Sequence, residues 1–440
     1  MSRSIQRVAA ALAAAFGLLA LSIGWWTLGG VATRDDNPRR FFIEQHSPRG
    51  AIVDRAGELL AVSSPVSEAY VRLYPLPVVA PVVGYYSLNY GLAGVEEALD
   101  GVLRGPLDPL DQLLHRPRVG RTVRTTIDLA AQHDLAVRLA QPGAAVILSI
   151  PDGAVLALES YPAYDPNTLD RDWKQLSVDP SSPLLNRVTQ GLYQPGALFQ
   201  TLLLAEVLER GTATITQTVE RPDRPVALTD LVVDCARTAP MTTLAEAYAN
   251  GCPAPFADLG LALGESALIS ITQRWQLDVP PALELRTSAL ATPTTSLSTT
   301  LALQAFAVGQ STLTVSPLQA VLVAATVGNR GVRPPAHIVS DVMSIGDVWT
   351  PYTSTRASGA QIIAPTTARS ILQAMRIEDD IAGHGGAAFS GDKQLSWFIG
   401  LMPASEPRYA IAVLIETPRG NAATEAENIG RAALRALAGR

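Results

Sequence analysis

The sequence contains few lysines, cysteines and histidines, and each shortage limits the chemistry available to the protein. Only Lys174 and Lys393 are lysines among the 34 basic residues of the 440-residue chain, so a mechanism that needs a lysine base has two candidates. The five histidines and two cysteines lack the spacing of metal ligands, and we predict neither a metal site nor a cofactor. The net charge of −6 gives no reason to expect a nucleic-acid partner.

The N-terminal region has no charged residue between Arg7 and Arg34, and residues 8–28 are almost wholly apolar. About 20 apolar residues are enough for a helix to cross a bilayer, so we predict a transmembrane helix at about residues 8–28. Arg3 and Arg7 precede it, which indicates a cytoplasmic N-terminus and an extracytoplasmic remainder at the cell membrane. The alternative is a signal peptide with its exit at residues 30–32. Signal peptides have apolar cores of about 7–15 residues, so we favour a retained single-pass anchor.

Cys235 and Cys252 are the only cysteines in the chain. In an oxidising compartment, two cysteines in one region can form a disulfide. The alternative is that both are small buried residues, because sequence spacing does not reveal the geometry that a disulfide needs. The sequence leaves both readings open.

The pattern along the chain predicts an anchor segment at 1–33, a small module at 34–121 and a larger domain at 122–440. The module is rich in proline, glycine and arginine, which is typical of hairpins and loops. The larger domain opens with an amphipathic helix that Thr126 can cap, with Asp128 in its first turn. Strand pairs are expected at 143–150 with 154–160 and at 395–403 with 408–416, and helices at 245–262, 301–307, 317–327 and 425–437. Strands at both ends with helices between them indicate an α+β fold with an antiparallel sheet.

Several local sequences, in this order, resemble those of the class B penicillin-binding proteins, the membrane-anchored D,D-transpeptidases that cross-link peptidoglycan. The resemblance implies the penicillin-binding transpeptidase fold, an antiparallel sheet flanked by helices. Each motif alone is weak, but seven in register over most of the chain make chance agreement improbable. They are "RGAIVDRAGELLA", "VVGYYSLNYGLAGVEEALDGVLRG", "TTIDLAAQ", "LALESYPAYDPN", "LLNRVTQGLYQPG", "VGQSTLTVSPLQ" and "WFIGLMPASEPRYAIAVLIE".

The first catalytic element of that family is Ser-x-x-Lys at a helix start. This spacing places both side chains on one helix face, so that the lysine can accept the proton of the serine hydroxyl. In this sequence, Ala197 and Gln200 occupy the matching positions in "YQPGALFQ". A methyl group cannot attack a carbonyl carbon, and a neutral amide is not a useful base near pH 7.

The other two elements of the family, Ser-x-Asn and Lys-Thr-Gly, are also degenerate in this sequence. The stretch "AYANGCPAPFADLG" puts Gly251 and Pro253 at the serine and asparagine positions. The stretch "IAGHGGAAFSGDKQLSWFIG" aligns with the segment around Lys-Thr-Gly-Thr. It places His384, Gly385, Gly386 and Ala387 at those four positions.

These losses, set beside the retained scaffold motifs, imply a catalytically inactive relative that acts as a scaffold or regulator in cell-wall synthesis. Class B proteins pair with membrane-embedded glycan polymerases of the SEDS family, so the resemblance implies such a partner at the anchor and residues 34–121. One alternative is an active D,D-transpeptidase whose nucleophile has moved to Ser390 of "SGDK", although this stretch is typical of a turn between strands.

A second alternative is a protein that binds stem peptides or penicillin without forming a covalent bond. Gln200 and His384 would then contact the ligand. His384 could become cationic and hold a terminal carboxylate. Its other interpretation is a solvated or neutral histidine at a strand end.

Overall fold

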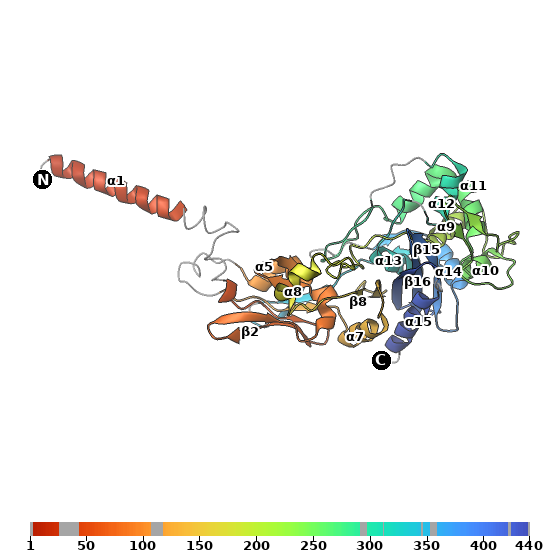
Figure 1. Cartoon of the computed structure of the whole chain (residues 1–440). Coiled ribbons are helices and arrows are strands. Elements are labelled where there is room, and N and C mark those ends of the chain that lie inside the picture. The colour runs from red at the N-terminus through yellow and green to blue at the C-terminus, as the bar shows by residue number, and fades with distance from the viewer. Residues whose placement is uncertain are drawn as a thin grey trace.

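The computed structural model describes residues 3–25, 44–106, 118–290, 297–310, 312–344, 346–352, 359–420 and 424–438. Helix α1 (Arg3–Trp25) has no buried residue and is long and apolar enough to span a bilayer, as predicted, although the predicted end of the span lies outside the described residues. Helix α11 (Pro253–Arg274) passes the same test of length and composition, but its most apolar stretch is 44% buried. We therefore assign α11 to the folded main domain, where Figure 1 places it among the other helices, and not to the membrane.

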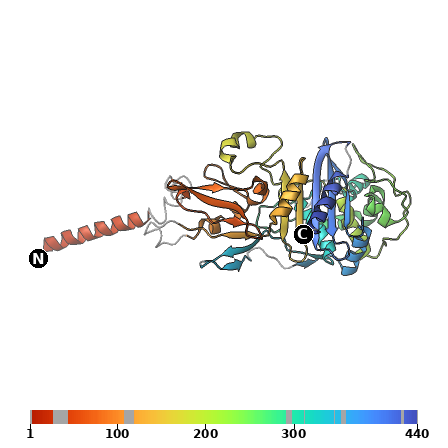
Figure 2. The same ribbon diagram turned by 90° about the horizontal axis from the view of Figure 1, so that it is seen from below.

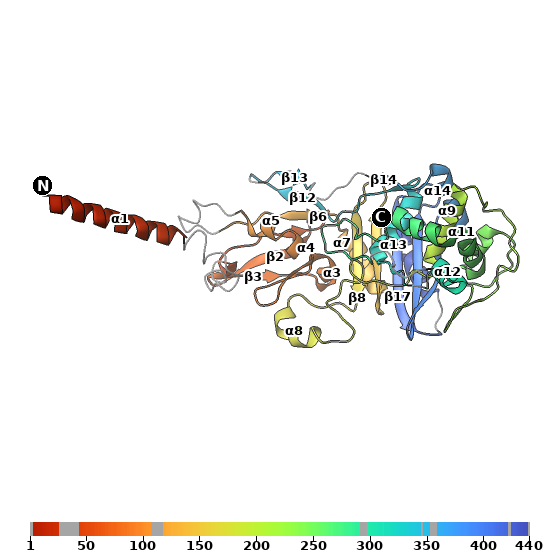
Figure 3. The same ribbon diagram turned by 90° about the horizontal axis from the view of Figure 1, so that it is seen from above.

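The N-terminal module is built on a six-stranded sheet in the order β13-β12-β6-β1-β2-β3. Its strands are β1 (Ile52–Val53), β2 (Leu59–Val66), β3 (Ala69–Leu73), β6 (Val123–Thr125), β12 (Val339–Met343) and β13 (Trp349–Pro351). β1 pairs with β6 in parallel, and β12 pairs with β6 antiparallel. Strands from both sides of the predicted boundary at residue 121 therefore share one sheet, as Figure 3 shows for β12 and β13 beside β6.

The remaining elements of the module are short helices and a hairpin, held by a buried ion cluster. The elements are η2 (Pro77–Val79), α3 (Ala80–Val83), β4 (Tyr85–Ser87), β5 (Gly91–Ala93), α4 (Gly94–Ala98) and α5 (Asp100–Arg104). The Glu96 carboxylate accepts from Arg49 at 2.9 Å and from Arg72 at 2.5 Å. Buried charges are tolerated when paired in this way, so the cluster fixes α4 against the first strands.

The main domain contains a five-stranded antiparallel sheet in the order β15-β16-β17-β7-β8. The strands are β7 (Gly143–Ser149), β8 (Val155–Tyr161), β15 (Ala382–Ser390), β16 (Lys393–Met402) and β17 (Tyr409–Pro418). Both predicted strand pairs are present, and pairing of β17 with β7 joins the two ends of the domain. The α+β prediction is confirmed.

Helices cover both faces of this sheet because its strands are apolar on both sides. The side chains of α7 (Leu129–Arg138) and α15 (Glu425–Ala438) pack on one face with Ile147 and Val413. The other face carries α9 (Leu198–Glu209) and α13 (Pro317–Gly328), with Val146 and Leu414. In Figure 2 the blue strands lie between the N-terminal module and the green helices.

The other elements of the main domain complete its helical part and its edges. They are α8 (Leu169–Leu176), α10 (Leu244–Ala249), α12 (Thr300–Ala307), α14 (Pro365–Ala374) and the two-stranded pairs β9 (Val226–Ala227) with β10 (Val232–Val233) and β11 (Val332–Arg333) with β14 (Ala360–Gln361).

Two details of the predicted helices were wrong. The helix expected at 245–262 is two helices, α10 and α11, because the chain turns at Gly251, whose φ is +63°. The N-cap of α7 is Asp128, which accepts from the Ala131 amide at 3.0 Å, while the Thr126 hydroxyl donates to the Val155 carbonyl instead.

Candidate functional site

The first predicted element lies at the start of α9, after a turn that requires glycine. Gly196 has a φ of +53°, and a Cβ there would come within 2.4 Å of the Ala387 carbonyl oxygen. Ala197 follows as the N-cap residue, with helical dihedral angles and no side-chain cap. The turn therefore places Ala197, whose side chain is a methyl group, against strand β15.

One turn later, Gln200 is almost completely buried and links α9 to the start of α11. Its Nε2 donates to the Cys252 carbonyl oxygen at 3.3 Å, and its Oε1 has no hydrogen-bond partner among the described residues. The amide is neutral and partly committed to this contact. The side chain therefore joins two structural elements of the domain.

The second element is the turn between α10 and α11. Gly251 adopts its left-handed conformation within this turn, and a Cβ there would lie 2.9 Å from the Gly385 carbonyl oxygen. Pro253 occupies the first turn of α11, where its missing N–H costs nothing. The turn thus brings position 251 directly against the strand that carries position 385.

The third element lies on β15, where His384 is only 1% exposed. Its Nε2 is 2.9 Å from the Ala197 carbonyl oxygen and donates to it, and its ring stacks on Tyr248 with centroids 3.9 Å apart. Burial lowers the pKa of His384 to about 4, and the charge of Arg237 acts in the same direction. The solvated interpretation of His384 is wrong, and a cationic His384 that holds a carboxylate conflicts with this environment.

The same strand places Gly386 against the start of α9. A Cβ on Gly386 would lie 2.6 Å from the Ala197 Cβ and 3.6 Å from the Ala236 Cβ. The three predicted elements therefore meet at one place. Of the eight predicted positions, seven are buried and one, Ala387, is half-buried. The buried ones are Ala197, Gln200, Gly251, Pro253, His384, Gly385 and Gly386.

A segment that the sequence did not point to covers this meeting place, and we call residues 235–237 the strap. Cys235 and Cys252 form a disulfide, which settles the question that the sequence left open. Ala236 lies over the site, since its Cβ would be 3.0 Å from a Cβ added to Gly251. The Arg237 guanidinium donates to the Ala249 carbonyl at 2.7 Å and to Glu427 of α15 at 3.2 Å. The strap is thus fixed at both ends.

Comparison with known proteins shows which family has this arrangement. The sequence model described as the penicillin binding protein transpeptidase domain matches residues 143–435. The chain belongs to this family. The N-terminal module of this penicillin-binding protein homologue matches, over residues 49–115, a second model, the penicillin binding protein A dimerisation domain.

Individual relatives agree with this assignment. The peptidoglycan D,D-transpeptidase PbpA of Mycolicibacterium smegmatis is 30% identical over an alignment that covers 94% of both chains. PbpA of Mycobacterium tuberculosis is 29% identical, again over 94% of both chains. The imipenem acyl-enzyme complex of penicillin-binding protein A from M. tuberculosis superposes with a TM-score of 0.80 at 29% identity, covering 90% of this chain and 99% of that one.

The remaining candidate residues of this penicillin-binding protein homologue lie elsewhere. Ser390 and Lys393 face each other at the exposed tip of the β15–β16 hairpin, as the turn-like sequence predicted, and the Lys393 ammonium binds Glu416 at 2.8 Å. Beside Gln200 on α9, Thr201 shares a hydrogen bond of 2.8 Å with the Tyr248 hydroxyl. Within the described ranges, no group of three or more His, Cys, Asp or Glu side chains is placed to hold a metal ion.

Proposed function

We propose that this chain is a membrane-anchored penicillin-binding protein homologue without transpeptidase activity, which acts by contact as a scaffold or regulator of peptidoglycan synthesis. The observation that supports this most directly is the start of α9. There, a methyl group and a buried amide stand where the family's acyl transfer uses a serine hydroxyl and a lysine amine.

The chemistry of acyl transfer explains why these two side chains matter. The nucleophile must carry a lone pair that becomes reactive when a neighbouring base removes its proton. The Ala197 side chain has no such atom. The Gln200 amide remains neutral, and it donates its hydrogen to the Cys252 carbonyl. Introducing serine at position 197 alone, or lysine at position 200 alone, would therefore restore only one of the two groups that acyl transfer needs.

The third element supports the same proposal through its charge. A cation on β15 would attract the carboxylate of a peptide or of a β-lactam. The burial of His384 lowers its pKa to about 4, so the ring is neutral at pH 7. The strap adds a physical obstacle, because Ala236 lies against both Gly251 and Gly386. A ligand that approaches β15 there would have to displace the strap.

A displaced nucleophile at Ser390 gains little support from its position. Gly386 packs against Ala197, and Ser390 is four residues further along the same strand. With a rise of about 3.4 Å per residue, the two positions are about 14 Å apart. The Lys393 ammonium is also paired with Glu416. Ser390 thus lacks a free base beside it and is remote from the predicted site.

The proposed location and partner follow from the anchor and the module. We place α1 in the cell membrane and the rest of the chain outside the cytoplasm, where the Cys235–Cys252 disulfide is chemically stable. The proposed partner is a SEDS-family glycan polymerase that contacts the anchor and the N-terminal module. The match of residues 49–115 to a dimerisation domain supports an interface on this module.

Intact-protein mass spectrometry after exposure to a β-lactam tests the proposal. We expect no mass increase for the full-length protein in detergent, while penicillin-binding protein A of M. tuberculosis, which forms acyl-enzyme complexes, serves as the positive control. An acyl adduct on this chain would overturn the proposal. Loss of that adduct in a Ser390→Ala variant would identify the displaced nucleophile.

A further inference from the structure

The β2–β3 hairpin of the N-terminal module turns an apolar face toward solvent. Six of its side chains point to the same side of the sheet, because the strand register sets them opposite each other in three pairs. The pairs are Val62 with Leu73, Ser64 with Val71, and Val66 with Ala69. We call these six side chains the hairpin face. None of them is charged, and Val66, Val71 and Leu73 are 53%, 44% and 41% exposed. A sheet face that borders water is normally polar, so this face is suited to a contact.

The opposite side of the hairpin is occupied inside the module. The buried Arg72 guanidinium donates to the Glu96 carboxylate and to the Gly50 carbonyl. The Ser63 hydroxyl accepts from the Arg49 amide at 3.1 Å. A slip of the register by one residue would turn Arg72 outward and break its ion pair. The buried ion pair therefore keeps the hairpin face directed outward.

Strand β3 also forms one edge of the six-stranded sheet, opposite β13 (Figure 3). Many proteins protect an edge strand from pairing with another chain by placing lysine, proline or a free charge on it. β3 has neither lysine nor proline, and its one charged side chain, Arg72, is committed to Glu96. The edge of β3 therefore lacks the usual protection beside the hairpin face.

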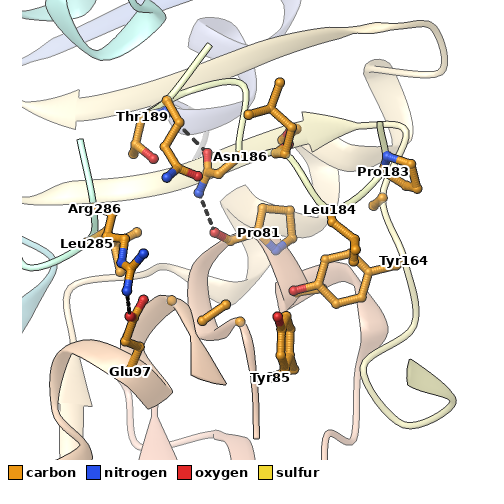
Figure 4. Close-up of a pocket in the computed structure, with 18 of the residues that line it drawn as sticks. Pro81, Tyr85, Glu97, Tyr164, Pro183, Leu184, Asn186, Thr189, Leu285 and Arg286 are labelled. Carbon is orange, nitrogen blue, oxygen red and sulfur yellow. Dashed lines mark hydrogen bonds and ion pairs between the residues drawn. The ribbon is translucent and has the colours of Figure 1, made fainter. Parts of the chain in front are cut away.

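The side of the module that faces the main domain is already engaged. The Asn186 amide donates to the Pro81 carbonyl at 2.8 Å (Figure 4). Arg286 of the main domain forms an ion pair with Glu97 of α4, which Figure 4 also shows. These contacts leave the hairpin face, on β2 and β3, available to a partner.

We propose that the hairpin face binds the hairpin face of a second copy of this chain. The sequence model of a penicillin binding protein A dimerisation domain matches residues 49–115, and this range contains all six side chains. An uncharged face can also pack on an identical one, because no like charges are brought together. The contact is isologous, so that each copy contributes the same side chains.

The membrane anchor makes this small contact sufficient. A stable interface in solution buries about 800 Å² on each partner, which six partly exposed side chains do not supply. With α1 in the membrane, all copies carry the hairpin on the same side of one bilayer, which raises their effective concentration. The pairing thus rests on the membrane location proposed above, and it is independent of whether the chain catalyses acyl transfer.

Förster transfer between copies of the full-length protein in lipid vesicles tests this pairing. Cys235 and Cys252 form a disulfide, so Ala56→Cys provides a single free thiol for the dyes, in the exposed turn between β1 and β2. At a low protein-to-lipid ratio we expect transfer that falls as unlabelled protein is added. Val71→Lys combined with Leu73→Lys brings ammonium groups together across the contact. It should lower the association constant at least tenfold.

Val178→Lys combined with Val279→Lys is the matched control, because both valines are exposed in the main domain, away from the module. Thermal unfolding checks that both double variants are folded. The proposal is overturned if no transfer occurs, if lysines at 71 and 73 leave the transfer unchanged, or if the control variant lowers it equally.

A dye on Ser64→Cys separates pairing from insertion of the hairpin face into the bilayer. We expect brominated lipids to leave its fluorescence unchanged, and strong quenching would overturn the proposal in favour of lipid contact. The acyl adduct with a β-lactam is measured separately, so failure of the pairing leaves the proposed loss of transpeptidase activity intact.

Discussion

Replacing His384 by glutamine should remove a pH dependence of stability that comes from one buried ring. His384 donates to the Ala197 carbonyl at 2.9 Å and stacks on Tyr248. Burial, the main cause, lowers its pKa from 6.5 to about 4 in the folded protein. Between those two values the unfolded chain holds a proton at this position that the folded chain does not. Stability must therefore rise with pH through this window.

The size of the effect follows from the two pKa values. The interval from 6.5 to about 4 corresponds to about 3 kcal/mol of unfolding free energy. This contribution is fully present above pH 6.5 and is lost progressively as the pH falls toward 4. His384→Gln has no group to titrate at this position. The wild type should therefore lose about 3 kcal/mol more than the variant between pH 7 and pH 4.

Urea unfolding of the full-length protein in detergent, followed by tryptophan fluorescence at several pH values, measures this difference. His133→Gln is the control, because His133 is exposed on α7 and its replacement removes a histidine without touching the site. A difference between wild type and His384→Gln that does not change with pH would refute the reasoning. It would mean that the ring at 384 is solvated or held as a cation, and the proposed closure of the site would then be wrong.

Three further predictions concern the stability of the main domain. Burial raises the pKa of Glu159 to about 8, so between pH 5 and pH 8 the folded protein keeps a proton that the unfolded chain loses. The wild type is therefore destabilised as the pH rises through this window. In the same urea assay, the unfolding free energy of Glu159→Gln should rise by about 4 kcal/mol relative to that of the wild type between pH 5 and pH 8. Replacing Cys235 and Cys252 by serine should cost about 3 kcal/mol in urea unfolding, because the disulfide closes a loop with a sequence separation of 17. Gly386→Ala should cost about 1–3 kcal/mol in thermal unfolding, because its Cβ would meet that of Ala197 at 2.6 Å.

Each of these predictions has a result that contradicts it. Gly101→Ala is the control for Gly386→Ala, because an added Cβ at 101 meets nothing within 4 Å, and equal destabilisation of both would remove the packing argument. A Glu159→Gln variant that tracks the wild type from pH 5 to pH 8 would show that Glu159 ionises normally. Unchanged stability without the disulfide would mean that the strap does not depend on it.

Local signals in the sequence were enough for much of the sheet and for several helices. The apolar runs at 143–150 and 395–403 predicted strands because continuous apolar runs suit strands covered on both faces. The turn at 390–393 was recognised from its glycine and aspartate. The break at Gly251 was missed, although Pro253 is the kind of residue that opens a helix.

The candidate site was predictable in its positions but not in its environment. The resemblance aligned Ala197, Gly251 and His384 with three family motifs, and the structure brings these positions together. Their burial depends on contacts between segments that are distant in sequence, such as the stacking of Tyr248 on His384. The covering position of Ala236 has no local signature. Long-range packing decides such features, and periodicity or spacing does not report them.

The return of the chain through β12 and β13 to the first sheet has a consequence for how this protein can be divided. β12 pairs with β13 on one side and with β6 on the other, and β6 in turn pairs with β1. Deleting everything before residue 122 would remove β1, β2 and β3 but leave β6, β12 and β13, and would expose the inner side chains of a half-sheet to water. Any shortened version must remove two separate stretches of chain. A mechanical force applied at α1 would likewise be transmitted to the main domain through the paired strands β1, β6 and β12 as well as through the covalent chain.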